Sequence, residues 1–156
     1  MADVLDGGVP LVDAAIARLD VEIPALRTIG RAADLARLTA AKALPSPGST
    51  PAAFVIEPAD TAGANAMAAG LLVRQLITVR LVIVLALYHA NDPTGAAALE
   101  QLDTLKPLLM AALIGWEPGG DYTPIEHERR GLVSSLGSPL VVFQHALRTG
   151  WHLRKH

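Results

Sequence analysis

Residues 75–89, QLITVRLVIVLALYH, decide the fold of this chain. The odd-numbered side chains are apolar from Ile77 to Leu87, whereas the even-numbered positions mix apolar residues with Arg80. This alternation and the density of β-branched residues predict a β-strand. A strand of about 15 residues spans roughly 50 Å at 3.3 Å per residue. A compact domain of this size is narrower, so we expect the strand to bend, to bulge or to project beyond the body.

The high apolar content, 51% of the 156 residues, raises the possibility of a membrane span, and the most apolar stretch is residues 66–90. Arg74, Gln75 and Arg80 interrupt it, however, and the uncharged part covers only residues 81–90. A spanning helix needs about 20 apolar residues. We therefore expect no membrane association.

The chain before this strand predicts two helices and a short strand. Pro10 suits a first helical turn, and the loop between the second helix and the short strand is rich in proline. In chain order we expect a helix over 9–20, an extended piece over 21–29, a turn at Gly30, a helix over 31–43, a loop over 44–51, a strand over 53–57 and a long surface loop over 59–70.

The chain after the strand predicts one long helix and a β-rich tail. Thr94 is a candidate N-cap, Pro107 should kink or split the helix, and Gly115 is a natural stop. The tail predicts strands over 124–128, 132–136, 140–146 and 148–154, with turns at Arg130-Gly131 and 137–139.

Helices that cover one face of a sheet give an α+β, two-layer fold. We expect a mixed, mainly antiparallel sheet packed against helices. The length of 156 residues fits a single domain over residues 1–156, with residues 59–70 and 152–156 as its flexible parts.

Charge is unevenly distributed along the chain although the net charge is only −2. Residues 1–26 carry five acids and one arginine, a net −4, while residues 127–156 carry five bases and one glutamate, a net +4. Nucleic-acid binding needs a basic footprint that neutralises phosphates, so we expect no specific nucleic-acid partner. The two ends are either ordinary solvated segments or complementary surfaces that join copies of the chain.

The sequence contains no catalytic signature. There are no cysteines, Ser134 and Ser135 do not lie in a G-x-S-x-G motif, and no phosphate-binding glycine loop occurs. In a strand, Glu126 and Glu128 share one face and His127 points away, which argues against a local metal site. We expect no enzyme activity, no cofactor and no bound metal.

The basic residues are the candidate functional residues, as contacts to a neighbouring subunit or a partner. Arg74 and Arg80 lie six residues apart, on one side of the long strand, where they either discourage stray edge pairing or face another subunit. The candidates for this interface are Arg74, Arg80, Arg129, Arg130, Arg148, Arg154 and Lys155. Trp116 and Trp151 are expected as core anchors.

A specific order of segments runs along nearly the whole chain. It comprises LVDAAIARL at 11–19, VEIPALRTIGRAADLARL at 21–38, TPAAFVIEP at 50–58, G-x-x-x-R-Q at 70–75 and LIGWEPGG at 113–120, followed by a short β tail. This order resembles the tail terminator (tail-completion) proteins of long-tailed phages. Its most telling pieces are residues 51–55, PAAFV, and residues 113–118, LIGWEP, whereas the basic run at 152–156 is not part of the pattern.

The resemblance implies a structural protein of the virion that catalyses no reaction and binds no cofactor. It would assemble as a ring of identical subunits, a hexamer, on the head-proximal end of the tail tube. The ring would stop tube polymerisation and join tail to head, so its partners would be itself, the tail tube protein and the head–tail connector protein. The implied location is the neck region of the virion, after assembly in the host cytoplasm. The alternatives are another head–tail joining or minor tail protein and a non-viral α/β binding module.

Overall fold

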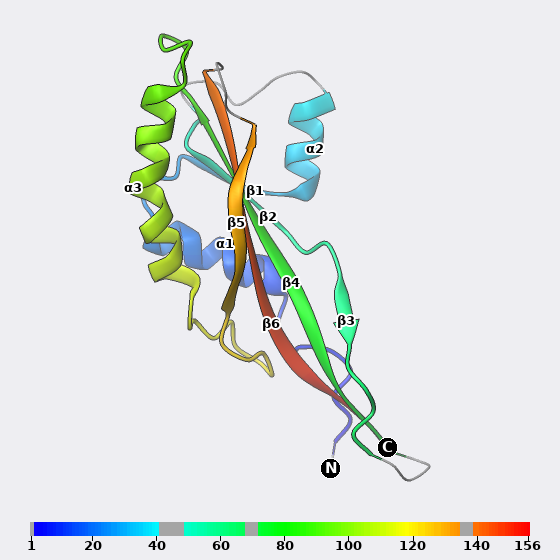
Figure 1. Ribbon diagram of the computed structural model, residues 1–156. Coiled ribbons are helices and arrows are strands. Elements are labelled where there is room, and N and C mark those ends of the chain that lie inside the picture. The colour runs from blue at the N-terminus through cyan, green and yellow to red at the C-terminus, as the bar shows by residue number, and fades with distance from the viewer. Residues whose placement is uncertain (1, 41–48, 68–71, 135–138) are drawn as a thin grey trace.

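The computed structural model describes residues 2–40, 49–67, 72–134 and 139–156. Within these ranges a six-stranded sheet packs against helices (Figure 1). The strands are β1 (Thr28–Arg31), β2 (Ala52–Ile56), β3 (Asp60–Ala62), β4 (Val73–Tyr88), β5 (Glu126–Ser134) and β6 (Leu140–Lys155). The helices are α1 (Leu11–Glu22), α2 (Ala32–Ala40) and α3 (Ala96–Leu113). This is the α+β fold predicted from the sequence.

The sheet has the order β1-β2-β4-β6-β5, and β3 pairs with β4 on the side away from β6. Strands β1 and β2 run parallel, and the other four pairs of neighbouring strands are antiparallel. The sheet is therefore mixed and mainly antiparallel, as expected.

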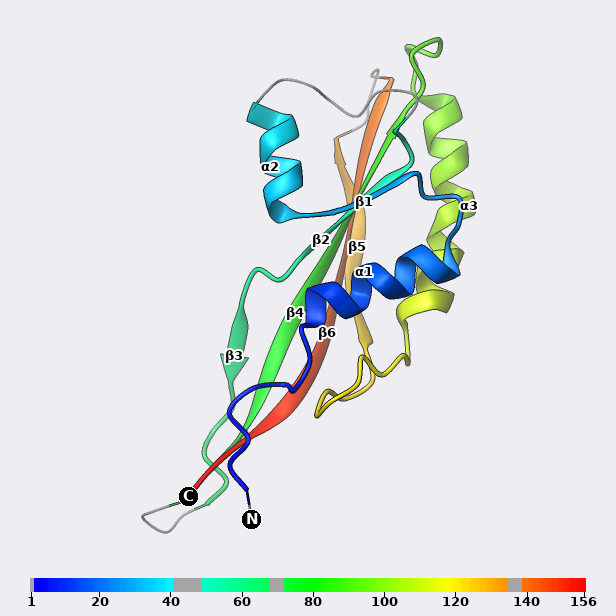
Figure 2. The same cartoon turned by 180° about the vertical axis from the view of Figure 1, so that it is seen from behind.

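The predicted long strand is β4, and its partner β6 is as long. The two strands pair in unbroken register over 16 residues, from Val73 opposite Lys155 to Tyr88 opposite Leu140. The predicted strands over 140–146 and 148–154 are thus one strand. Of the three expected solutions for its length, projection is the one found, because β4 and β6 extend together past α1 and α3 (Figures 1 and 2). We call this projecting pair, residues 73–79 and 149–155, the arm.

The core lies between the sheet and helices α1 and α3. The odd-numbered β4 residues predicted to be apolar, such as Leu81, Ile83 and Leu85, are fully buried there. Helix α1 contributes Leu11, Ala15 and Leu19, a stripe repeated every four residues. We call this side of the sheet the inner face. Trp151 also belongs to this core, and the half-buried Trp116 packs against it, which confirms both tryptophans as core anchors.

The opposite, outer face is covered by a helix only near β2. Helix α2 places Leu35 against Phe54, Ala52 and Ala86, a small second cluster. Further along β4 this face carries Arg80, which is exposed. Much of the outer face is therefore open to a partner.

Two predicted turns are strand residues instead. Gly30 lies within β1, where a Cβ atom would come within 3.0 Å of Asp34 Oδ2 and 3.2 Å of Phe54 Cδ1, so glycine is present for close approach. Arg130 and Gly131 lie within β5, so the predicted strands over 124–128 and 132–136 are one strand. Arg130 and Gly131 pair in regular register with His145 and Gln144, and the two register shifts of β5 lie on either side of them, at residues 127–129 and 132–134.

The expected surface loop over 59–70 contains the short strand β3, which pairs with β4 at Val79, Thr78 and Ile77. The predictions for residues 41–48, 68–70 and 135–138 lie outside the described residues. The three residues of β3 are exposed, as expected of a surface segment.

Helix α3 begins at a different N-cap from the predicted one and is not split. Gly95, at φ 78°, takes the N-cap position in place of Thr94, and Asp92 Oδ2 accepts a hydrogen bond of 2.8 Å from the Ala97 backbone. Pro107 sits within α3 without splitting it, because the buried Leu105 and Leu109 on either side hold the helix on the sheet. Gly115, at φ 77°, follows the helix end as predicted.

Candidate functional site

The structure separates the seven predicted interface residues into three places. Arg74, Arg154 and Lys155 lie at the tip of the arm, and Arg80 and Arg148 lie opposite each other in the middle of the sheet. Arg129 and Arg130 lie on β5, at one edge of the sheet. The basic residues therefore do not form one continuous patch.

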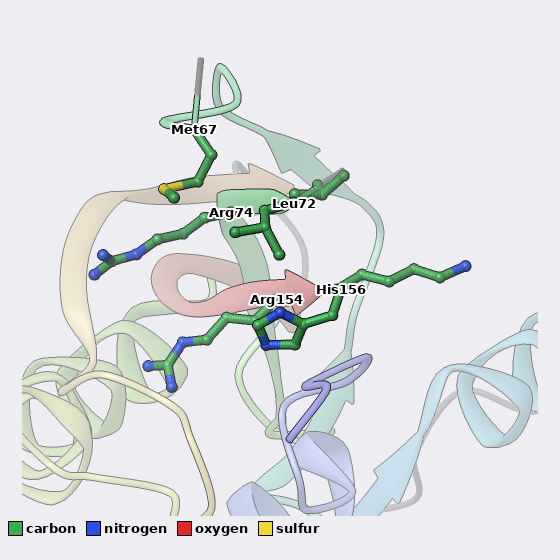
Figure 3. A pocket seen from close by; sticks show the side chains of 7 residues that line it. Met67, Leu72, Arg74, Arg154 and His156 are labelled. Carbon is green, nitrogen blue, oxygen red and sulfur yellow. The ribbon is translucent and has the colours of Figure 1, made fainter. Parts of the chain in front are cut away.

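At the arm tip, Arg74 of β4 is directly opposite Arg154 of β6. Their guanidinium groups extend to the same side of the arm (Figure 3). Like charges directly opposite each other destabilise a sheet, so this pairing is costly unless an acidic group or a partner compensates it. The tip is also hollowed by a pocket of about 280 Å³, lined by Met67, Leu72, Val73, Arg74, Arg154, Lys155 and His156.

The two oppositely charged ends of the chain meet at this arm within one subunit. The backbones of Val4 and Arg154 exchange hydrogen bonds of 2.8 and 2.9 Å, and Asp3 Oδ1 accepts a bond of 2.9 Å from the His156 backbone. Figures 1 and 2 show both termini at the same end of the molecule. The charge separation along the sequence is therefore not a separation in space.

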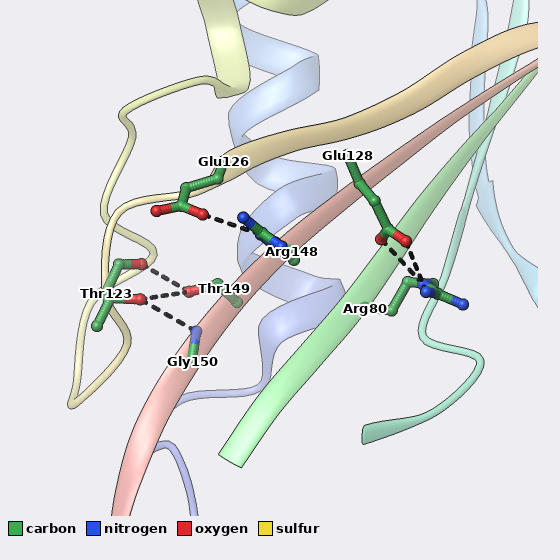
Figure 4. Close-up of polar contacts among 7 residues, drawn as sticks. All are labelled: Arg80, Thr123, Glu126, Glu128, Arg148, Thr149 and Gly150. Carbon is green, nitrogen blue, oxygen red and sulfur yellow. Dashed lines mark hydrogen bonds and ion pairs between the residues drawn. The ribbon is translucent and has the colours of Figure 1, made fainter. Parts of the chain in front are cut away.

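In the middle of the outer face, two arginines are neutralised by β5. Arg80 makes a two-pronged ion pair with Glu128, at 3.0 and 2.6 Å, and Arg148 Nε donates to Glu126 Oε2 at 2.9 Å (Figure 4). Both carboxylates thus share one face of β5, as the alternation predicted. These pairs stay partly exposed, so each contributes at most about 1 kcal/mol to stability.

A threonine network ties the base of the arm to the chain after α3. Thr149 Oγ1 donates to the Thr123 carbonyl at 2.6 Å, and Thr123 Oγ1 accepts from the Gly150 backbone at 3.1 Å (Figure 4). Gly150 allows close packing there, since an added Cβ atom would lie 3.0 Å from the carbonyl oxygen of Ile77. The arm is therefore anchored to the body rather than hinged loosely on it.

A histidine pair links β5 and β6 on the inner face. Nδ1 of His127 lies 2.9 Å from Nε2 of His145, whose side chain is fully buried. Burial, and then the neighbouring His127 and Arg130, lower the pKa of His145 to about 4. Nδ1 of His145 has no hydrogen-bond partner among the described residues, so the neutral ring with its proton on Nε2 fits the site best.

The β5 edge is exposed and basic. Arg129 and Arg130 make no ion pair within the described ranges, and Leu132 and Val133 beside them are 50% and 61% exposed. No described strand pairs with the second edge of β5.

Two acidic residues missed by the sequence reasoning lie on the other side of the sheet. Glu57 follows β2 and Asp60 begins β3, on either side of Pro58, and both are exposed. Partial burial, and then the Asp60 carboxylate, raise the pKa of Glu57. Burial and then the charges of Glu57, Asp6 and Asp60 raise the pKa of Tyr122, so the phenol lies within the negative field of these acids. Their signal in the sequence was two acids around a proline at a strand end.

The described ranges hold no group of three or more His, Asp or Glu side chains arranged for a metal ion. None of the described helices is both long and apolar enough to cross a membrane.

Comparison with known proteins identifies the family. The sequence model described as phage tail terminator protein matches residues 8–155. A search of curated proteins returned no match. Since the family match spans nearly all of the fold described above, the chain belongs to the phage tail terminator family, whose members are structural proteins of the virion tail.

Proposed function

We propose that this chain forms a closed ring of identical subunits, a hexamer, that caps the head-proximal end of the tail tube. The ring stops tube polymerisation and presents the surface to which the head–tail connector binds. The protein acts in the neck region of the virion after assembly in the host cytoplasm. The role in the tail follows from the family, and the ring and its partners are the part that we propose.

The arm is the observation that carries this proposal. Its two segments are paired at every residue, as part of the 16-residue register between β4 and β6, so the arm is a rigid projection rather than a loose loop. A terminator must hold the tube on one side while blocking the addition of further tube subunits. A rigid projection at one end of the body supplies a surface that reaches along the tube.

The chemistry of the arm tip suits a protein partner. Arg74 and Lys155 supply positive charge, while Met67 and Leu72 supply an apolar wall beside it. Interfaces combine an apolar centre with arginine in this way. We therefore assign the tip to the tail tube protein, which would present acidic and apolar side chains there.

Electron microscopy of a phage that lacks this protein tests the proposal against its nearest rival. Loss of a terminator predicts abnormally long tails, because tube growth no longer stops. Loss of another head–tail joining protein would leave tails of normal length detached from heads. Complementation with the wild-type chain should restore normal length, and complementation with the double variant Arg74→Glu, Lys155→Glu should not.

A further inference from the structure

Two edges on opposite sides of β4 carry opposite charges: β5 on one side and, on the arm side of β2, the short strand β3 on the other. Arg129 and Arg130 lie on β5, the last strand on one side. Glu57 precedes β3 and Asp60 begins it, on the other side of β4 (Figure 1). Charges of opposite sign on opposite edges are what two copies need in order to meet edge to edge.

These four residues differ from Arg80 and Arg148 because they make no ion pair within the described part of their own subunit. Arg80 and Arg148 are paired with Glu128 and Glu126, whereas Arg129, Arg130, Glu57 and Asp60 make no ion pair within the described ranges. Partial burial raises the pKa of Glu57, and the second cause is the neighbouring Asp60 carboxylate, a charge of the same sign. Each edge is therefore left with a charge that a second molecule can neutralise.

The strand directions allow this contact within a ring. Strand β3 is antiparallel to β4, β4 to β6, and β6 to β5, so β5 and β3 run in opposite directions. Rotation about a ring axis keeps the direction and the face of each subunit. The β5 edge of one copy would then meet the β3 edge of the next in antiparallel orientation, the more favourable one for strands.

The faces agree as well. Arg130 is opposite the buried His145, and Asp60 is opposite the buried Val79, so both side chains lie on the inner side of the sheet. Along the strands, Arg129 and Arg130 stand level with Val82 and Ile83 of β4, whereas Asp60 stands level with Val79, nearer the arm. Contact between these residues therefore requires neighbouring subunits to meet with an offset along the strands, which the tilt of strands in a closed sheet supplies.

From this arrangement we propose that the β5 edge of one subunit, with Arg129 and Arg130, binds the β3 edge of the next subunit, with Glu57 and Asp60. This inference rests on the proposed ring and names its subunit contact. The contact is heterologous, since each copy uses two different surfaces, and repeated rotation closes it. The two register shifts in β5 and the three-residue length of β3 confine backbone pairing to a short segment.

Charge reversal on each edge tests the contact. One variant, Arg129→Glu with Arg130→Glu, has two acidic edges, and a second, Glu57→Lys with Asp60→Lys, has two basic edges. By size-exclusion chromatography with light scattering at low salt, each alone should lose the ring and elute near the 16.3 kDa monomer. Mixed in equal amounts, the two should associate in alternation, and one chain with all four changes should form the ring again. Circular dichroism should show both variants folded, since all four residues are exposed.

The controls reverse exposed charges away from both edges. Glu100→Lys with Glu117→Lys, and separately Arg74→Glu with Lys155→Glu, should keep the ring. A wild-type ring that survives both edge reversals would overturn the edge contact and leave the proposed function standing. A wild-type chain that stays monomeric while the mixed variants associate would support the edge contact and overturn the preformed ring.

Discussion

Nδ1 of His127 on β5 lies 2.9 Å from Nε2 of His145 on β6, and the second nitrogen of His145 is buried without a partner among the described residues. Protonation of either ring therefore breaks this arrangement. A proton on His127 would place two N–H groups against each other, or force the proton of His145 onto its unpartnered nitrogen. A proton on His145 would add a buried charge beside Arg130.

The first prediction concerns pH. The pKa of His145 is lowered from 6.5 to about 4, so between these values the unfolded chain binds more protons than the folded chain. The free energy of unfolding should thus fall as pH falls, by about 2 kcal/mol between pH 7.5 and pH 4.5. Urea denaturation across this range measures the loss.

The variant His145→Leu should flatten that pH dependence. Its neighbours Ile83 and Phe143 are apolar, so leucine fits the site. His127 and Arg130 from β5 are the charged groups that act on His145, and Lys106 of α3 stands over the adjacent Phe143 ring. His152→Gln, on the arm, is the matched control and should keep the wild-type slope. If the free energy of unfolding of His145→Leu falls with pH as steeply as that of the wild-type chain, His145 is not the source of the pH dependence.

A second prediction concerns the base of the arm. Gly150→Ala should lower the free energy of unfolding by about 1–3 kcal/mol, because the new Cβ would lie 3.0 Å from the Ile77 carbonyl oxygen. Gly131→Ala on β5 is the control, since nothing lies within 4 Å of its added Cβ. Thermal unfolding of the two variants measures the difference. Equal midpoint temperatures for both variants would contradict tight packing around Gly150.

A third prediction separates core from surface on α1. Leu19→Ala should cost about 2–5 kcal/mol, since Leu19 is 0% exposed within the main core. Val21→Ala, two residues away and 74% exposed, should change stability by less than about 0.5 kcal/mol. A comparable loss of unfolding free energy in both variants would mean that α1 packs against the sheet through a face other than the one that carries Leu19.

The sequence predicted what depends on local pattern. The alternation in β4 placed Ile83 and Leu85 on one side and Arg80 on the other, and the same period placed Glu126 and Glu128 together. Such alternation survives folding because a strand has only two faces. The family, too, could be identified from the order of segments.

The errors arose where long-range packing overrides local preference. Gly30 and Gly131 looked like turn residues, yet both lie within strands paired to distant partners. Pro107 looked like a break, but the packing of its neighbours on the sheet keeps α3 continuous. The meeting of both chain ends at the arm joins Asp3 to His156, and no local pattern reports a contact over that separation.

A fourth prediction concerns the paired arginines of the outer face. Arg80→Ala and Arg148→Ala should each change stability by less than about 1 kcal/mol, because their ion pairs are partly exposed. Both variants should still form rings, in contrast to the β5 edge variants. Ring loss in Arg80→Ala, detected by light scattering, would move the subunit contact to the middle of the outer face.

The most direct measurement of the central claim uses tails assembled without this protein. Purified tails are incubated with the chain, supplied with fresh tube protein and imaged by electron microscopy. The account predicts a closed ring at one end of each tail and no further growth at that end. Ends without a ring, together with continued lengthening at both ends, would contradict it.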